Sequence, residues 1–99
     1  PGDGPSKEVR ETGRRRATYK ALAEDGDVSV FKMHGKGDPG YKITSLLVTE
    51  SALCLVENEQ DLPGGSDYGG ILTSATGLGG ALISRLKNAG IVFEGPMQN

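Results

Sequence analysis

The sequence predicts an α+β fold, and three observations in it support that class. An Asp25-Gly26 pair separates two extended runs, which is typical of an antiparallel β-hairpin. The stretch 41–58 is apolar around most of a helical circumference. Leu78, Leu82 and Leu86 recur every fourth residue, which predicts an apolar stripe on a second helix. The expected order is an antiparallel hairpin, a buried helix, a short strand, an amphipathic helix and a final strand.

The first thirteen residues differ in composition from the rest. Residues 1–13 are predicted to be a linker, because proline and glycine break regular structure there and the remaining residues are mostly charged. Ser6 is placed to cap one helical turn, but that turn has too few apolar residues to pack. Residues 14–99 are expected to form the folded α+β portion.

The hairpin strands are predicted at 16–24 and 27–34. A two-residue type I′ turn at Asp25-Gly26 places Ala23 opposite Val28 and Tyr19 opposite Lys32. Both faces of this hairpin are partly apolar, and an isolated two-stranded hairpin is only marginally stable in water. We therefore expect it to join a wider sheet.

The second half of the chain alternates turns with helices. The helix at 41–58 is apolar nearly all round, and we expect polypeptide outside these 99 residues to cover it. A short strand is predicted at 71–73. Thr73 or Ser74 then caps an amphipathic helix that ends at Gly90, and 91–93 form the last strand before Gly95-Pro96.

Length and composition exclude several classes of protein. The chain has 99 residues, 35% of them hydrophobic, which is enough for one small domain. Its formal net charge is −2, so it has no general attraction for nucleic acid. No apolar run reaches the roughly 18 residues of a membrane span. Cys54 is the single cysteine, which excludes an internal disulfide and argues against a metal site. Because the chain begins with Pro1, we expect it to be a piece of a longer protein.

The run 35–40, Gly-Lys-Gly-Asp-Pro-Gly, matches the G-x-G-x-x-G pattern of dinucleotide-binding loops. The match follows a predicted hairpin strand, and Pro39 and Asp38 suit a helix cap better than a phosphate cradle. We favour a turn with an N-terminal cap. A small nucleotide-binding domain that uses 35–40 is kept as an alternative.

Glu50 stands out as a carboxylate within an apolar helix. A buried carboxylate needs a partner, so Glu50 is either a general acid or base or a structural hydrogen-bonding residue, and we favour the latter. His34 is expected at the surface and Cys54 in the core. The basic run 14–16 is expected to be a solvated strand entry.

Several blocks in a fixed order resemble one family. They are Gly-Pro-Ser at 4–6, Gly-Asp-Pro-Gly-Tyr at 37–41, Glu-Ser-Ala-Leu-Cys-Leu at 50–55, Leu-Pro at 62–63 and Gly-Gly-Ile-Leu-Thr at 69–73. In these blocks the chain resembles the C-terminal end of saccharopine-dehydrogenase-like oxidoreductases, the group that includes trans-acting enoyl reductases. The family usually has a proline after the threonine of the last block, where this chain has Ser74.

The resemblance implies a parent enzyme that binds NAD or NADP in an N-terminal Rossmann domain upstream of this chain. This piece would hold no cofactor and no metal, and would not be catalytic alone. It would shape the substrate site or a contact between subunits, with Gly37, Asp38, Gly40, Tyr41 and Thr44 as candidate substrate-binding residues. Tyr41 and Glu50 are the candidate catalytic residues.

The expected partner is the parent's own Rossmann domain, with a homo-oligomer also open. A cytoplasmic location without nucleic-acid binding is expected, while association of the parent with membranes or lipid stays open. The rival hypothesis from another class is a non-catalytic protein-interaction module whose exposed apolar helix docks a partner.

Overall fold

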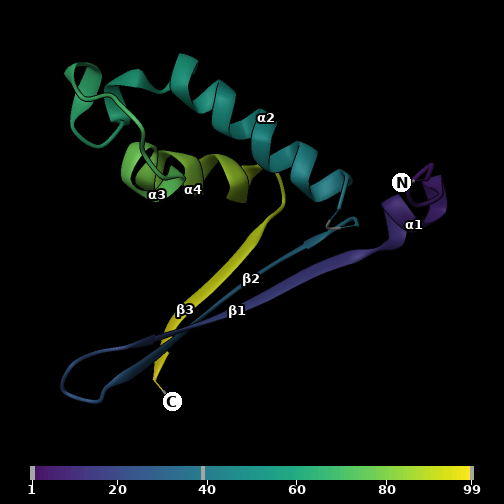
Figure 1. Ribbon diagram of the computed structural model, residues 1–99, viewed down its shortest axis with the longest axis horizontal. Helices are drawn as coiled ribbons and strands as arrows, with labels where there is room; N and C mark the ends of the chain where they lie inside the picture. The colour runs from purple at the N-terminus through teal and green to yellow at the C-terminus, as the bar shows by residue number, and fades with distance from the viewer. Residues whose placement is uncertain (1, 39, 99) are drawn as a thin grey trace. The chain divides into compact units, whose positions relative to one another are not determined.

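The computed structural model describes residues 2–38 and 40–98, which form an α+β arrangement (Figure 1). The strands make one antiparallel sheet in the order β1-β2-β3. The predicted fold class is therefore confirmed. In chain order the elements are α1 (Lys7–Thr12), β1 (Arg14–Leu22), β2 (Val28–Lys36), α2 (Lys42–Glu57), the 3-10 turns η1 (Glu59–Asp61) and η2 (Gly65–Asp67), α3 (Ser74–Gly77), α4 (Gly79–Asn88) and β3 (Val92–Gln98).

The hairpin of β1 and β2 has a different register from the predicted one. Leu22 lies opposite Val28 and Tyr19 opposite Phe31, so the pairing is shifted by one residue. A type I′ turn would need a positive φ at Asp25, whereas the described residues with positive φ are all glycines, Gly26 among them at +91°. The Gly26 N–H donates instead to the Ala23 carbonyl at 3.0 Å, which makes a longer turn of the type I kind with a glycine bulge.

The final strand is longer than predicted. β3 runs from Val92 to Gln98 and pairs with β2, with an irregularity opposite Val30 to Lys32. The strand continues through Gly95 and Pro96, where the sequence predicted its end. Proline is tolerated because β3 is an edge strand and because the pairing is irregular there.

The predicted short strand at 71–73 is wrong. These residues have no regular structure, and Ile71 is fully exposed. Thr73 acts as the N-cap of α3: its hydroxyl accepts from the Thr76 N–H at 3.1 Å, and the Thr76 hydroxyl accepts from the Thr73 N–H. Two glycines before this segment and a cap at its end leave too few residues for a strand. The cap at Thr73 itself is confirmed.

The predicted amphipathic helix is divided into two pieces. α3 ends at Gly77 and α4 begins at Gly79, with Leu78 between them. The leucine stripe is nevertheless buried, with Leu78, Leu82 and Leu86 at most 8% exposed. The left-handed glycine predicted after the helix is Gly90, at a φ of +102°.

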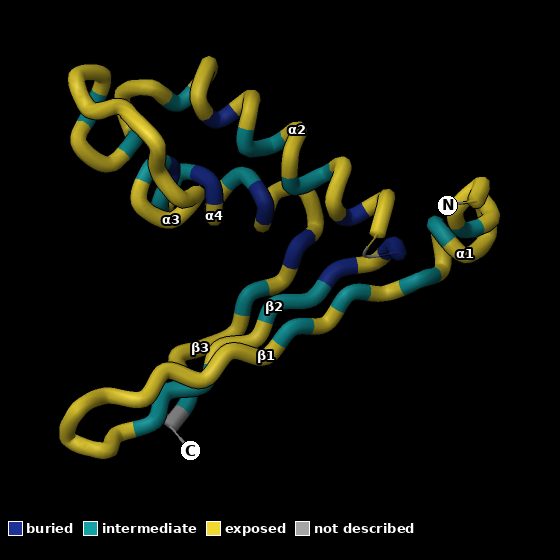
Figure 2. Tube along the Cα trace, in the orientation of Figure 1, coloured by how far each residue is buried: buried dark blue, intermediate teal, exposed yellow. Residues whose placement is uncertain are grey.

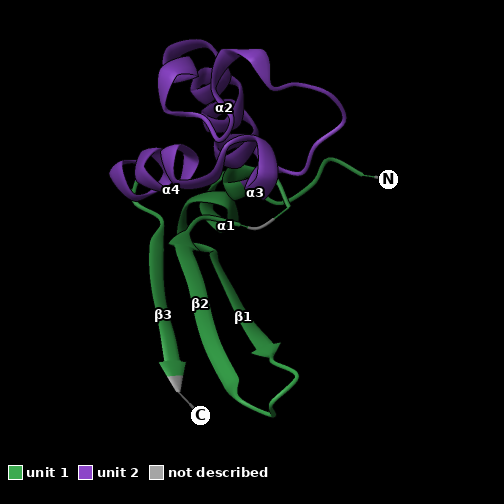
Figure 3. Cartoon of the chain, turned by 90° about the vertical axis from the view of Figure 1, so that its left-hand side faces the viewer, with its two compact units in different colours: residues 1–43, 90–99 green, residues 44–89 purple. Residues whose placement is uncertain are grey.

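The chain divides into two compact units, residues 1–43 with 90–99 and residues 44–89 (Figure 3). Unit 1 contains the sheet and α1, and its buried apolar residues are Ile43 and Ile91. Unit 2 contains most of α2 together with α3 and α4, and its buried apolar residues are Cys54 and the three leucines of the stripe. Figure 2 shows buried, intermediate and exposed residues along α2.

The N-terminal segment forms a helical turn, as Ser6 predicted. The Ser6 hydroxyl accepts from the Val9 N–H at 3.3 Å, and α1 has no buried residue. Two backbone hydrogen bonds connect the end of this segment to the loop after β2. The Gly37 N–H donates to the Gly13 carbonyl at 2.6 Å, and the Asp38 N–H donates to the Arg10 carbonyl at 3.1 Å.

Candidate functional site

Asp38 caps the start of α2. Its carboxylate accepts from the Tyr41 N–H at 2.9 Å and from the Lys42 N–H at 3.0 Å, and its carbonyl accepts from the Ile43 N–H at 3.0 Å. The first N–H groups of a helix lack partners within the helix, so a carboxylate at that position stabilises the helix start. Asp38 is 6% exposed. Its predicted role in substrate binding competes with this structural one.

The glycines of the G-x-G-x-x-G match do not form a phosphate cradle. Gly35 lies within β2, and a Cβ there would come within 2.7 Å of the Ile91 side chain and 3.2 Å of the Ile43 side chain. The helix N–H groups that a phosphate would use are already hydrogen-bonded to Asp38. The residues present therefore do not fit the pyrophosphate of a dinucleotide, and this argues against the alternative that uses 35–40.

Of the remaining candidates near the start of α2, Gly37 is buried and the other three are exposed. Gly40 and Thr44 are open to solvent, and Tyr41 is 54% exposed. The Tyr41 ring lies against Gly4, where an added Cβ would come within 2.9 Å of it. Tyr41 is thus positioned by the N-terminal segment, with its other side accessible to a ligand.

Glu50 is part of an ion-pair network within unit 2. The Arg85 Nε–H donates to Glu50 at 2.7 Å, and a second Arg85 nitrogen donates to Glu57 at 2.7 Å and to Asn58 at 3.0 Å. The Arg85 and Glu50 side chains are 19% and 18% exposed. Hydrogen bonds to Glu57 and Glu50 raise the pKa of Arg85 above its usual value. This network connects α2 with α4. It supports the structural hydrogen-bonding role of Glu50, which is the alternative that the sequence analysis favours.

The two catalytic candidates do not lie together. Tyr41 directly precedes α2 and Glu50 is nine residues further on, which is about 13 Å along a helix axis. Nine residues at about 100° each also place them on opposite sides of the helix. The geometry therefore supports one site at the start of α2 and a separate structural contact at Glu50.

Arg85 is a residue that the sequence analysis missed. It lies three residues after Leu82 and one before Leu86, inside the apolar stripe of the second helix. A cation at such a position needs a carboxylate nearby. A cation in one apolar helix and a carboxylate, Glu50, in the other are together the sequence signal that could have predicted this ion pair.

Cys54 is fully buried, as predicted. Burial raises the pKa of its thiol above the usual value, and the positive charge of Arg85 partly opposes that shift. A neutral buried thiol is a poor nucleophile, which is consistent with a packing role.

One side of α2 is exposed and carries no charge. Val48, Leu55 and Val56 are 64%, 56% and 79% exposed, and Ala52 between them is also exposed. Their spacing of four, three and one residues places all four on one side of the helix. Ser45 and Thr49, on the same side, are uncharged as well. These six residues are called the uncharged face of α2.

Two further features are absent from the described residues. Between residues 2 and 38 and between 40 and 98, no three His, Cys, Asp or Glu side chains are grouped so that they could hold a metal ion. In the same part of the chain, no helix has both the length and the hydropathy needed to cross a bilayer.

Comparison with known proteins finds relatives that are all much longer. The chain is 41% identical over 94 residues to a Mycobacterium tuberculosis protein provisionally named trans-acting enoyl reductase, covering 95% of this chain and 22% of that protein. It is 34% identical over 95 residues to the trans-acting enoyl reductase of Mycobacterium ulcerans, with the same coverage of both chains. The Mycobacterium bovis protein of that name is 32% identical over 94 residues, covering 94% of this chain and 21% of the relative.

The chain therefore spans about a fifth of the length of the curated relatives it matches. No protein-family model matches it. No solved structure matches it either.

Proposed function

We propose that the chain is the C-terminal part of a larger oxidoreductase that reduces C=C bonds, and that it is not catalytic alone. The names of the relatives support the reaction class, and their length supports a larger protein. Membership of the saccharopine-dehydrogenase-like group, dependence on NAD or NADP and a cytoplasmic location are parts of the same proposal. They rest on the resemblance of the sequence blocks.

The observation that carries the proposal is the uncharged face of α2. Exposed apolar residues on a small chain are normally scattered, whereas here Val48, Ala52, Leu55 and Val56 lie in one row. We infer that this face packs against the dinucleotide-binding domain of the same protein. An interface of this kind would account for a helix that is apolar on its exposed side as well as on its buried side.

The nicotinamide cofactor would supply the hydride, and the protein would supply binding and position. Because the loop 35–40 does not fit a dinucleotide, the cofactor would be held by the upstream domain. In this chain we propose Gly40, Tyr41 and Thr44 as the region that faces the substrate, with Gly37 as a buried glycine of the same loop. Asp38 would act there through the cap that fixes the loop.

The test is to express the longer reading frame that contains this chain. The longer protein is expected to bind NADH or NADPH and to reduce an α,β-unsaturated thioester, and the 99 residues alone are expected to do neither. Val48→Lys together with Leu55→Lys should separate the domains and reduce activity by about tenfold or more, because two charges would be buried at the contact.

Leu22→Lys is the matched control, because Leu22 is 74% exposed at the far end of the hairpin and should tolerate the charge. A stop codon directly upstream, or a longer protein that binds neither nucleotide, would favour the protein-interaction module instead. Equal activity of the α2 variant and the Leu22 control would contradict the docking role of α2.

A further inference from the structure

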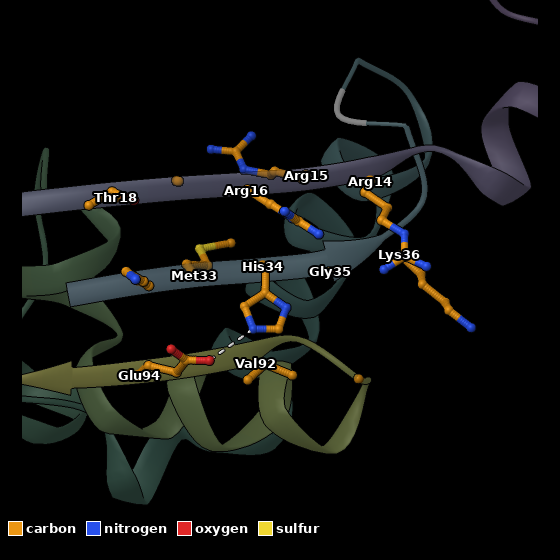
Figure 4. A pocket seen from close by; sticks show the side chains of 13 residues that line it. Arg14, Arg15, Arg16, Thr18, Met33, His34, Gly35, Lys36, Val92 and Glu94 are labelled. Atoms are coloured by element: carbon orange, nitrogen blue, oxygen red, sulfur yellow. Dashed lines mark hydrogen bonds and ion pairs between the residues drawn. The ribbon is translucent and has the colours of Figure 1, made fainter.

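A groove on the sheet of unit 1 has no role in the function proposed above. It has a volume of about 620 Å³, within the range of small-molecule sites, and residues of β1, β2 and β3 line it (Figure 4). The residues that argue for a ligand are Arg14 and Arg16 on β1 and His34 and Lys36 on β2. The groove with these residues is called the basic groove.

Register places these side chains on one face of the sheet. Arg14 lies directly opposite Lys36, and Arg16 lies directly opposite His34. Residues directly opposite each other in an antiparallel pair project from the same face, and positions two apart on a strand share that face. Figure 4 shows the Arg14 and Lys36 side chains next to each other at one end of the groove.

Three cations of the basic groove, Arg14, Arg16 and Lys36, are not neutralised within the described part of the chain. Like charges directly opposite each other destabilise a sheet, and Arg14 and Lys36 are such a pair. Neither these two nor Arg16 forms an ion pair with a described residue, whereas Arg85 in unit 2 has two carboxylates. The single carboxylate that lines the groove is Glu94, which accepts a hydrogen bond from His34 Nε2 at 3.2 Å.

The chemistry of these groups favours a phosphoryl group as the missing partner. Two guanidinium groups offer planar, paired N–H donors that match phosphate oxygens, and a lysine adds a compact positive charge. The chain as a whole has a net charge of −2, so the positive field is local and suits a small anion better than a long polyanion. We propose that the basic groove binds the phosphoryl group of a small phosphate ester.

This site does not depend on the proposed reductase function, because the sheet residues alone define it. The experiment titrates the 99-residue chain with inorganic phosphate, pyrophosphate and ADP at constant ionic strength, and follows backbone amide signals by NMR. Saturable shifts are expected at residues 14–18 and 32–36. ADP binding tighter than pyrophosphate would identify a nucleotide ester as the source, and equal binding would identify the phosphoryl group alone.

The decisive variant is Arg14→Gln combined with Lys36→Gln. Losing two charged donors should weaken pyrophosphate binding by about tenfold or more. The matched control is Lys7→Gln with Lys87→Gln, which removes the same charge from positions outside the groove. The variant relieves a like-charge pair and should fold at least as well as the native chain, which circular dichroism can check.

A second measurement is thermal unfolding. Pyrophosphate should raise the unfolding midpoint of the native chain and of the control, but not that of the Arg14 and Lys36 variant. Equal binding by variant and control would overturn the proposal. A glutamate peptide that binds as tightly as pyrophosphate would also overturn it, because the groove would then recognise acidic protein surfaces.

Discussion

Asp38 shows at the scale of one residue how a helix start is fixed. Its carboxylate holds the N–H groups of Tyr41 and Lys42, so its replacement leaves two donors without a partner. We expect Asp38→Ala to lower the free energy of unfolding by about 1 kcal/mol, measured by urea denaturation. Asp67→Ala, at an exposed carboxylate, serves as the control and should change stability little. Equal effects of the two substitutions would contradict the capping role.

Cys54 provides a second test at this scale. Because the thiol is buried and its pKa is raised, it should react with a thiol reagent at pH 8 at least about tenfold more slowly in the folded chain than in urea. The folded state favours the neutral thiol, so this contribution to stability is present below about pH 8.5 and is lost as pH rises through the folded pKa. Fast labelling of the folded chain would show that the thiol is accessible.

The sequence could predict much at the residue scale. The Asp38 turn, the Ser6 and Thr73 caps and the left-handed Gly90 all follow from local chemistry within a few residues. The partner of Glu50 could not be found in this way. Arg85 is thirty-five residues away, and only the tertiary packing of α2 and α4 brings the two side chains together.

At the scale of elements, we expect the stability of the contact between α2 and α4 to depend on the Arg85 network. Glu50→Ala leaves a partly buried guanidinium with one of its carboxylates missing, and we expect the melting temperature to fall by about 5 °C. Glu59→Ala, an exposed carboxylate next to the same helix, is the control and should leave the melting temperature unchanged. A general acid or base without a structural role would leave the melting temperature of the Glu50 variant unchanged as well.

The hairpin shows where element-level prediction reaches its limit. The sequence located both strands and the Asp25-Gly26 turn, but a turn one residue longer shifted every cross-strand pair. Both turn types use a glycine with positive φ, so the pattern alone could not choose between them. The same shift placed Arg14 opposite Lys36, a pairing that the predicted register did not contain.

At the scale of the whole molecule, the central claim is that the uncharged face of α2 is an interface that other polypeptide completes. The chain spans about a fifth of the length of its relatives, and α2 exposes apolar residues that the rest of unit 2 does not cover. The class and order of most elements followed from the sequence. What the sequence could not predict is the identity of the surface that we propose to cover α2, since in this proposal that surface lies on residues outside this chain.

Sedimentation velocity of the 99-residue chain over a range of concentrations tests this claim most directly. The native chain should associate as concentration rises, because the uncharged face of α2 will pack against another copy of the chain. The variant with both Val48→Lys and Leu55→Lys should remain monomeric. Leu22→Lys should associate like the native chain. A native chain that stays monomeric at every concentration and binds no hydrophobic dye would contradict the account.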